Sequence, residues 1–208
     1  MFEQVRDVLR GAEKIVFVTG AGISQESGIP TFRGKDGLWR NYDAMQLATI
    51  DAFYDNPKLV WEWYTERRAN IFQAKPNPGH DAIAELEKHC KCPILTQNID
   101  GLHQRAGSSD VYELHGSIVR IKCTVCDYVD DITGAFDELP PRCRCGEILR
   151  PDVVWFGEAL PQDVWQKAIA HASTCDAMII AGTSLVVSPA NTLPMYAKQN
   201  GEIGRAHV

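Results

Sequence analysis

Three short apolar runs, each followed at once by small or polar residues, most constrain how this chain can fold. They are Ile15–Val18, which precedes Thr-Gly-Ala-Gly, Pro93–Leu95, which precedes Thr-Gln-Asn, and Ala177–Ile180, which precedes Ala-Gly-Thr-Ser. Continuous apolar runs of this kind predict parallel strands that are buried on both faces. Because open α/β sheets bind ligands at the carboxyl ends of their strands, we expect the three polar ends to meet in one crevice of a Rossmann-like, doubly wound parallel sheet.

Helix signals stand between the predicted strands. Asn56, followed by proline, predicts an N-cap and a helix that continues to about Gln73, and a second helix is expected over Asn77–Lys88. A third helix is expected over Pro189–Gln199. The segment 122–150 differs, since it is rich in Cys, Pro and Asp and has little periodicity. We expect it to be a loop-rich insertion that is held by something other than a hydrophobic core.

These signals together predict one α/β domain with two insertions. The Rossmann-like domain is expected to comprise residues 1–34, 76–121 and 151–201, with a helical insertion at 35–75 and a cysteine-rich insertion at 122–150. A chain of 208 residues with 45% hydrophobic side chains is long enough to bury such a core.

The end of the chain departs from this pattern. Residues 202–208, Glu-Ile-Gly-Arg-Ala-His-Val, match the translation of a common sequencing-library adapter, and we expect this tail not to be native. A doubly wound sheet normally continues past the strand at Ala177–Ile180 and the helix after it into at least one more strand. We therefore expect C-terminal strands to be missing, which would leave a sheet edge uncovered.

Charge and composition limit the classes of partner. The chain has 21 Lys and Arg against 27 Asp and Glu, a net charge of −6, and no run of like charges, so a specific nucleic-acid partner is not expected. No apolar run approaches the roughly 20 residues that cross a bilayer, and the N-terminus lacks the apolar core of a secretory signal. We expect no membrane partner and a cytoplasmic location.

The cysteines predict a metal site. Seven cysteines, an odd number in a chain without a signal, argue against a disulfide framework. Cys123-x-x-Cys126 and Cys143-x-Cys145 have nearly the spacing of a four-cysteine site for one structural zinc ion, and the alternative is four reduced, buried thiols. A closed site with four thiolates leaves no coordination position open, so this zinc is not expected to take part in catalysis.

The first predicted strand leads into a glycine-rich turn. The sequence Thr-Gly-Ala-Gly-Ile-Ser at Thr19–Ser24 would let the backbone approach a pyrophosphate closely. The dinucleotide fingerprint is incomplete, because Gln25 stands where its third glycine would be. Taken alone, the turn fits an ordinary tight turn equally well.

Several longer motifs, in one order, resemble those of the sirtuin family of NAD-dependent protein-lysine deacylases. They are GAGISQESGIPTFRGKDGLW, TQNIDGLH, LHG, RPDVVWFGE and GTS, and the resemblance covers residues 5 to 201. It implies that NAD is a co-substrate and that acylated lysine side chains of proteins are the partners. The implied products are nicotinamide, O-acyl-ADP-ribose and free lysine.

The resemblance also implies roles for particular residues. In this family's reaction the acyl oxygen attacks C1′ of the nicotinamide ribose, and His115 is implied as the general base that takes a ribose hydroxyl proton, as an imidazole near neutrality can. The implied NAD-binding residues are Gly20, Ala21, Gly22, Ser24, Thr31, Phe32, Arg33, Trp39, Gln97, Asn98, Ile99, Asp100, Gly182, Thr183 and Ser184.

Two residues three apart on the helix predicted from Asn56 bear on the choice of acyl group. Tyr64 and Arg67 share a face of that helix, and Arg offers a planar fork and Tyr a hydroxyl donor to a carboxylate. Such a pair is also common as a plain surface pair. With Ala48 upstream, it resembles the sirtuin subclass that removes succinyl, malonyl and glutaryl groups, so we expect desuccinylation or demalonylation to exceed deacetylation.

The segment RPDVVWFGE supplies the remaining implied substrate contacts. Val154 and Phe156 are implied to form the channel for the lysine stem, with Gly157 and Glu158 near the peptide backbone. The same apolar residues also fit a core strand, and both descriptions can hold because strand residues alternate faces. Two other functions remain open at this point: NAD-dependent ADP-ribosyl transfer to protein, and a non-catalytic module that binds NAD and zinc.

Overall fold

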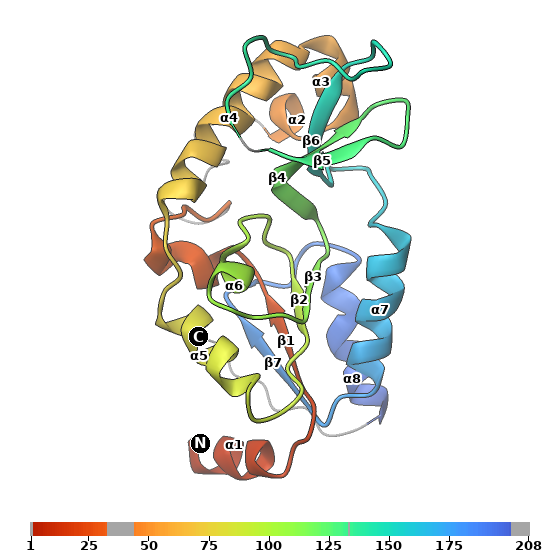
Figure 1. Ribbon diagram of the computed structural model, residues 1–208. Coiled ribbons are helices and arrows are strands. Elements are labelled where there is room, and N and C mark those ends of the chain that lie inside the picture. The colour runs from red at the N-terminus through yellow and green to blue at the C-terminus, as the bar shows by residue number, and fades with distance from the viewer. Residues whose placement is uncertain (1, 33–43, 133, 201–208) are drawn as a thin grey trace.

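The computed structural model describes residues 2–32, 44–132 and 134–200. Figure 1 shows two lobes, one above the other. The larger, lower lobe contains a four-stranded parallel sheet in the order β3-β2-β1-β7. Its strands are β1 (Ile15–Thr19), β2 (Ile94–Thr96), β3 (Val111–Glu113) and β7 (Ala177–Ala181). The three predicted strands are therefore present and adjacent.

Helices cover both faces of this sheet, as the doubly wound prediction requires. On one face, α7 (Gln162–Ser173) and α8 (Leu193–Asn200) bury small and aliphatic side chains against Val16, Val18 and Met178. On the other face, α1 (Phe2–Arg10) and α5 (Pro78–Leu86) pack against Ile15, Phe17 and Ile94. Figure 1 shows the two helical layers on opposite sides of the strands. Strands buried from both sides account for the continuous apolar runs in the sequence.

The smaller, upper lobe combines two segments that are distant in the sequence. Its antiparallel sheet has the order β5-β4-β6 and consists of β4 (Gly116–Cys123), β5 (Val129–Asp131) and β6 (Leu149–Val153). Its helices are α2 (Ala44–Leu47), α3 (Ile50–Asp55) and α4 (Pro57–Gln73). An aromatic core that includes Phe53, Trp61, Tyr64 and Trp155 joins the helices to the sheet. The helical segment and the cysteine-rich segment thus form one lobe, and its sheet extends beyond the segment 122–150 at both ends.

Capping residues explain where the helices begin. Asn56 caps α4, with its Oδ1 accepting a hydrogen bond from the backbone N–H of Leu59 at 3.1 Å. Asn77 caps α5 in the same way through the N–H of Gly79 at 2.9 Å. The helix predicted from Pro189 starts later, because a short 3₁₀ turn, η3 (Ala190–Thr192), precedes α8. The remaining short helices are η1 (Ala21–Ser27) and α6 (Leu102–Arg105).

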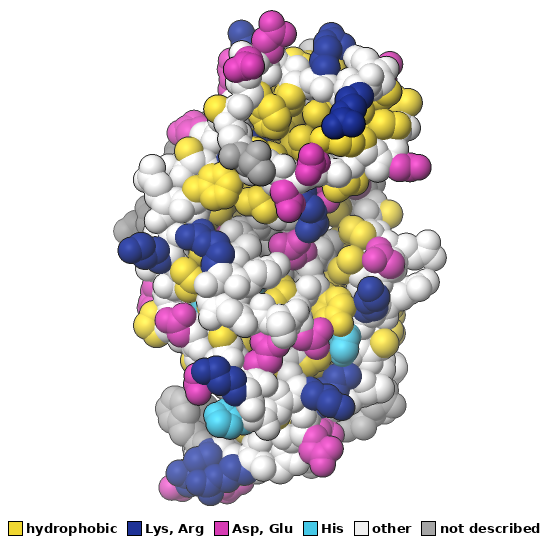
Figure 2. Space-filling view, viewed as in Figure 1, with side chains coloured by type: hydrophobic (Ala, Val, Ile, Leu, Met, Phe, Trp, Pro, Cys, Tyr) yellow, Lys and Arg dark blue, Asp and Glu magenta, His cyan; other side chains and the backbone are white. Residues whose placement is uncertain are grey.

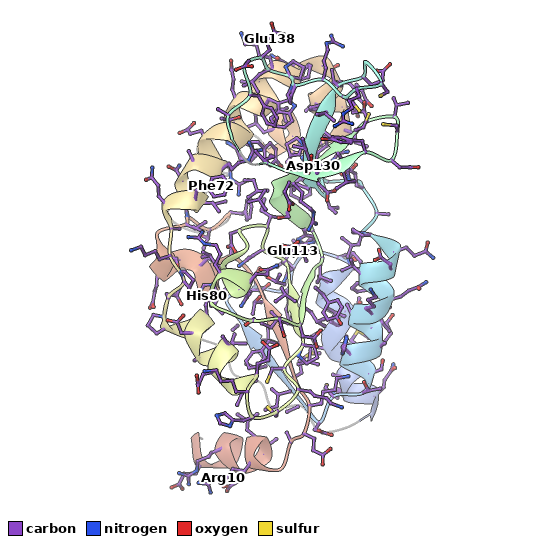
Figure 3. All side chains as sticks on the ribbon, in the orientation of Figure 1. Arg10, Phe72, His80, Glu113, Asp130 and Glu138 are labelled. Carbon is purple, nitrogen blue, oxygen red and sulfur yellow. The ribbon has the colours of Figure 1, made fainter. Side chains whose placement is uncertain are left out.

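The two lobes meet where β3 ends and the chain crosses to β4. Figure 3 labels Glu113 at this junction. The carboxylate of Glu113 accepts a hydrogen bond from Nη1 of Arg120 on β4 at 2.9 Å, and Nε of Arg120 bonds Asp152 at 3.1 Å. A network of charged side chains therefore ties the large sheet to the small one.

Figure 2 shows acidic and basic side chains interspersed over the visible face, without a broad field of one sign. In the part of the chain that the structure describes, no helix has both the length and the apolar character needed to cross a membrane.

Candidate functional site

A cleft of about 630 Å³ lies between the lobes, at the carboxyl ends of β1, β2 and β7. The predicted crevice is therefore present. The predicted residues that line it are Gly20, Ala21, Gly22, Thr31, Phe32, Ala48, Tyr64, Arg67, Gln97, Asn98, Ile99, His115, Val154, Phe156, Gly157, Glu158, Gly182, Thr183 and Ser184. Two more of the predicted residues, Ser24 and Asp100, are described but do not line it, and Arg33 and Trp39 lie outside the described residues.

Three glycines fit the loops at the bottom of the cleft together. A Cβ on Gly22 would lie 2.8 Å from the Cα of Gly182, and a Cβ on Gly20 would lie 2.6 Å from the Cβ of Thr183. Gly182 has φ +65°, which side chains disfavour, and a Cβ there would collide with the backbone of Ile23. The packing of one loop on the other thus requires glycine at these positions before any ligand is considered.

A buried hydrogen-bond network stands behind the glycine-rich turn. Ser24 donates its hydroxyl proton to Oδ2 of Asp100 at 2.7 Å. Asn98 donates from Nδ2 to the Ser24 hydroxyl and to the carbonyl of Gly20, each at 3.1 Å. The other carboxylate oxygen of Asp100 accepts from the N–H of Leu102 at 3.0 Å. Ser24 and Asp100 are therefore placed to hold the shape of the turn rather than to form the wall of the cleft.

His115 lies on the cleft wall just after β3. Its Nδ1 is 3.0 Å from the carbonyl oxygen of Gln97. A carbonyl can only accept, so Nδ1 carries the proton and Nε2 keeps its lone pair. Burial lowers the pKa of His115, against the opposing effect of the bond to Gln97. The side chain is therefore a neutral imidazole with one nitrogen able to accept a proton.

Tyr64 and Arg67 line the cleft from α4. The guanidinium carbon of Arg67 is 4.5 Å from the ring centre of Trp63 and 4.9 Å from that of Phe32, distances at which a cation is attracted to an aromatic face. Burial lowers the pKa of Arg67. Among residues 2–32, 44–132 and 134–200, no carboxylate forms an ion pair with Arg67. Within the described part of the chain, the charge of Arg67 contacts aromatic rings rather than a carboxylate.

The loop after β6 is fixed by the carboxylate of Glu158. Arg150 donates to both carboxylate oxygens, from Nη1 at 2.6 Å and from Nη2 at 2.8 Å, and the backbone N–H of Trp155 donates to one of them at 2.8 Å. Although burial opposes it, the bond from Arg150 lowers the pKa of Glu158. Glu158 borders the cleft, but its carboxylate is already engaged by this chain.

Backbone bonds place the rest of this loop. The N–H of Val154 donates to the carbonyl of His115, and the N–H of Phe156 donates to that of Ala48, both at 2.9 Å. Gly157 has φ +87°, which turns the chain after Phe156. The loop is thereby held between His115 and the helical segment.

The composition of the cleft wall fits a dinucleotide. Among the described lining residues, the only carboxylate is that of Glu158, which Arg150 neutralises, and the two glycine-containing loops present mainly backbone. A pyrophosphate would therefore meet amide groups without facing an unpaired negative charge.

A model of the Sir2 family matches residues 20–189, which is most of the chain. The chain belongs to the Sir2 family. It is 53% identical over 199 residues to a protein of Pyrobaculum aerophilum named NAD-dependent protein deacylase 2, covering 95% of this chain and 80% of that relative.

Solved Sir2 structures agree with this assignment. A Sir2 homologue in complex with NAD is 46% identical, with a TM-score of 0.91, and the match covers 98% of this chain and 81% of that one. A Sir2 protein with a deacetylated p53 peptide and 3′-O-acetyl ADP-ribose is 37% identical, with a TM-score of 0.89, and the match covers 98% and 85%. The Sir2 fold, with its parallel sheet and its small second sheet, is therefore the fold of this chain.

Four of the seven cysteines of this Sir2 chain, Cys123, Cys126, Cys143 and Cys145, lie together in the upper lobe, and none of them lines the cleft. All four Sγ atoms are within 4.8 Å of one another, and the pairs Cys123–Cys145 and Cys126–Cys143 are each 3.6 Å apart. A tetrahedron with Zn–S bonds of about 2.3 Å has edges of roughly 3.8 Å, so these sulfur atoms could hold a structural zinc ion. The Val125 N–H also points to Cys123 Sγ at 3.4 Å. The tighter second pair does not prevent this arrangement.

The sequence did not identify several residues of the Sir2 cleft. These are Trp63, Val153, Trp155, Leu160, Val187 and Ser188. Two signals could have found Trp63 and Trp155: the first precedes Tyr64 directly, and the second lies inside the motif that supplied Val154 and Phe156.

Proposed function

We propose that this chain is an NAD-dependent protein-lysine deacylase that removes succinyl and malonyl groups in preference to acetyl groups. The deacylase activity is supported by the names of its relatives and by the NAD and peptide complexes of its structural neighbours. The acyl preference is supported by the chemistry of the cleft wall.

One observation carries the preference for acidic acyl groups. Arg67 places a guanidinium on the cleft wall without an ion-pair partner in the described chain, and the hydroxyl of Tyr64 lies on the same helix face. A partly buried charge of this kind is unfavourable until an anion joins it. The carboxylate of a succinyl or malonyl group supplies that anion, whereas the methyl of an acetyl group does not.

Different residues of the cleft have different roles in the proposed reaction. NAD supplies the electrophilic ribose carbon and nicotinamide as the leaving group. His115 accepts a proton from a ribose hydroxyl at Nε2, because Nδ1–H is committed to the Gln97 carbonyl. Val154 and Phe156 enclose the apolar stem of the lysine, and the backbone around Gly157 faces the peptide.

The direct test is mass spectrometry of matched succinyl-lysine and acetyl-lysine peptides incubated with the protein and NAD. We expect O-succinyl-ADP-ribose, a higher kcat/KM for the succinyl peptide, and no product with His115→Ala. In Arg67→Met the ratio of succinyl to acetyl kcat/KM should fall about 10- to 100-fold, the value of a hydrogen bond to a charged group. Lys58→Met removes an exposed cation from the same helix and should leave that ratio unchanged.

Each other outcome rejects part of the proposal. A higher kcat/KM for the acetyl peptide would reject the acyl preference and leave the deacylase reaction. ADP-ribose attached to protein, with the acyl-lysine peptides unchanged, would identify an ADP-ribosyltransferase. NAD binding without any product would identify a binding module.

A further inference from the structure

Trp155 makes a buried hydrogen bond to the acyl side of the cleft. Its indole Nε1–H donates to the hydroxyl oxygen of Tyr64 at 2.9 Å, and the two residues are 3% and 2% exposed. They are 91 positions apart in the sequence, on the loop after β6 and on α4. Tyr64 is therefore not oriented by its own helix alone.

The chemistry of an indole decides the direction of the Tyr64 proton. An indole N–H is a donor only, so the phenol oxygen must accept this bond, and its own proton is left to point elsewhere. Within the described ranges, no acceptor receives that proton. We propose that Trp155 is a positioning residue for acyl selectivity: by occupying the Tyr64 oxygen as an acceptor, it makes the Tyr64 O–H a donor to the acyl tail. This inference rests on the function proposed above.

The surroundings of Trp155 hold the indole in place. The guanidinium carbon of Arg150 lies 3.5 Å from the centre of the indole ring, and that guanidinium is itself held by both oxygens of Glu158. The ring of Phe53 lies on it as well, with the ring centres 5.1 Å apart. The backbone N–H of Trp155 is bound to Glu158. The ion pair of Arg150 with Glu158 and the two ring contacts thus fix the indole that donates to the Tyr64 hydroxyl.

The orientation of one proton separates the two kinds of substrate. A carboxylate has oxygens that accept from both the Tyr64 O–H and the Arg67 guanidinium. An acetyl methyl group offers no acceptor, so it would leave the buried O–H unsatisfied, which costs free energy. Trp155 therefore favours the acidic acyl group and disfavours the neutral one through the same hydrogen bond.

A double-mutant cycle tests this role. The variants are Trp155→Phe, which keeps an aromatic ring and removes the donor, Tyr64→Phe, and the two combined. We expect Trp155→Phe to lower the succinyl-to-acetyl ratio of kcat/KM by about 3- to 10-fold, the range for one neutral hydrogen bond. The double variant should show the same ratio as Tyr64→Phe alone, because Trp155 acts through Tyr64.

Two further variants separate positioning from loss of structure. Trp61→Phe removes a similar buried indole bond, to the carbonyl of Leu149 at 2.8 Å in the same lobe, and should lower Tm without changing the ratio. Replacing Trp155 by benzothienylalanine exchanges the N–H for sulfur at nearly constant shape, and should reproduce the change in ratio at the wild-type KM for NAD.

The failures of the two proposals are distinguishable. If Tyr64→Phe leaves the succinyl preference intact, Tyr64 does not determine the acyl preference, and this part of the proposed function is rejected. If Tyr64→Phe lowers the ratio but Trp155→Phe does not, or if the two effects multiply in the double variant, the role of Trp155 is overturned and the acyl function stands.

Discussion

The hydrogen bond between His115 and the Gln97 carbonyl joins two parts of the site at the level of single atoms. It fixes the tautomer of the imidazole, and it connects the proposed base to Gln97, the residue directly after β2. Burial lowers the pKa of His115, so the neutral form that can accept a proton persists to lower pH than for an exposed histidine.

The lowered pKa of His115 is expected to determine how the rate of the proposed reaction declines at acid pH. Activity should fall as pH decreases through the His115 pKa, because the protonated imidazole cannot act as a base. We expect the midpoint of this decrease in kcat/KM to lie below about pH 6.5, the ordinary pKa of histidine. Initial rates between pH 5 and 8 measure it, with the exposed His89→Gln variant as a control that keeps the same midpoint. A midpoint above pH 7 would contradict this assignment of the base.

Single residues differ in how far sequence alone could predict them. The resemblance to sirtuins made His115, Tyr64 and Arg67 candidate residues, and all three line the cleft. The hydrogen bond from Trp155 to Tyr64 was not predictable, since the two residues are 91 positions apart and only the packing of the upper lobe brings them together. Ser24 and Asp100 were expected to bind NAD, and their contacts show that they first bind each other.

At the scale of elements, local signals located the helices and the buried strands. Asn56 and Asn77 identified the starts of α4 and α5 because a capping side chain bonds a backbone N–H only two or three residues later in the sequence. The strand β4 was not predicted, and the core strand considered for Val154 and Phe156 lies earlier than expected, since β6 ends at Val153. Their sequences mix charged and apolar residues, and their pairing depends on distant contacts with α4 and on the cysteine cluster.

The cysteine cluster leads to a prediction about the upper lobe. The purified protein should contain about one zinc ion per chain, and Cys126→Ser should lose it, since three thiolates no longer close the site. Metal loss should expose the core that contains Trp61, seen as a red shift of tryptophan fluorescence. Elemental analysis of Cys90→Ser, a thiol outside the cluster, should still give one equivalent. Much less than one equivalent in the unaltered protein would exclude a structural zinc.

At the scale of the whole molecule, the lower lobe and the cleft contain several imidazoles whose pKa is lowered by burial. Burial lowers the pKa of His80, His115 and His171, and it lowers the pKa of His103 to about 3. In each case the folded value is below the unfolded value near 6.5. The unfolded chain therefore binds more protons as pH falls, and the free energy of unfolding decreases with it.

His103 makes this dependence measurable. The neutral, buried His103 contributes to the free energy of unfolding, and this contribution is fully present above about pH 6.5. It is lost as pH falls, by up to about 1.4 kcal/mol for each pH unit below that value. Urea unfolding at pH 7.5 and 5.5 should show a smaller difference for His103→Gln than for the unaltered protein. His89→Gln should keep the original difference. An equal difference in His103→Gln would show that other groups determine the acid sensitivity.

The sequence predicted the doubly wound sheet, because strands that are buried on both faces are apolar along their whole length and can be recognised from their own residues. It did not predict that the helical and cysteine-rich segments would form a single lobe. That union depends on aromatic contacts such as Trp61 with Phe136, between residues that no local pattern connects.

The residues that line the cleft rest on different hydrophobic clusters: Tyr64 and Trp155 belong to the aromatic cluster of the upper lobe, whereas β1 and β7 are buried by the clusters on the two faces of the large sheet. Tyr64, Arg67 and Trp155 belong to the upper lobe, whereas Gly20, Gly182 and their neighbours belong to the sheet below. On the function proposed here, the side chains that recognise the acyl tail can change through mutation while the glycine loops around Gly20 and Gly182 stay the same, and Arg67 is the residue whose contact with Phe32 links the two parts. Such a division makes the range of substrates evolvable while the chemistry stays constant.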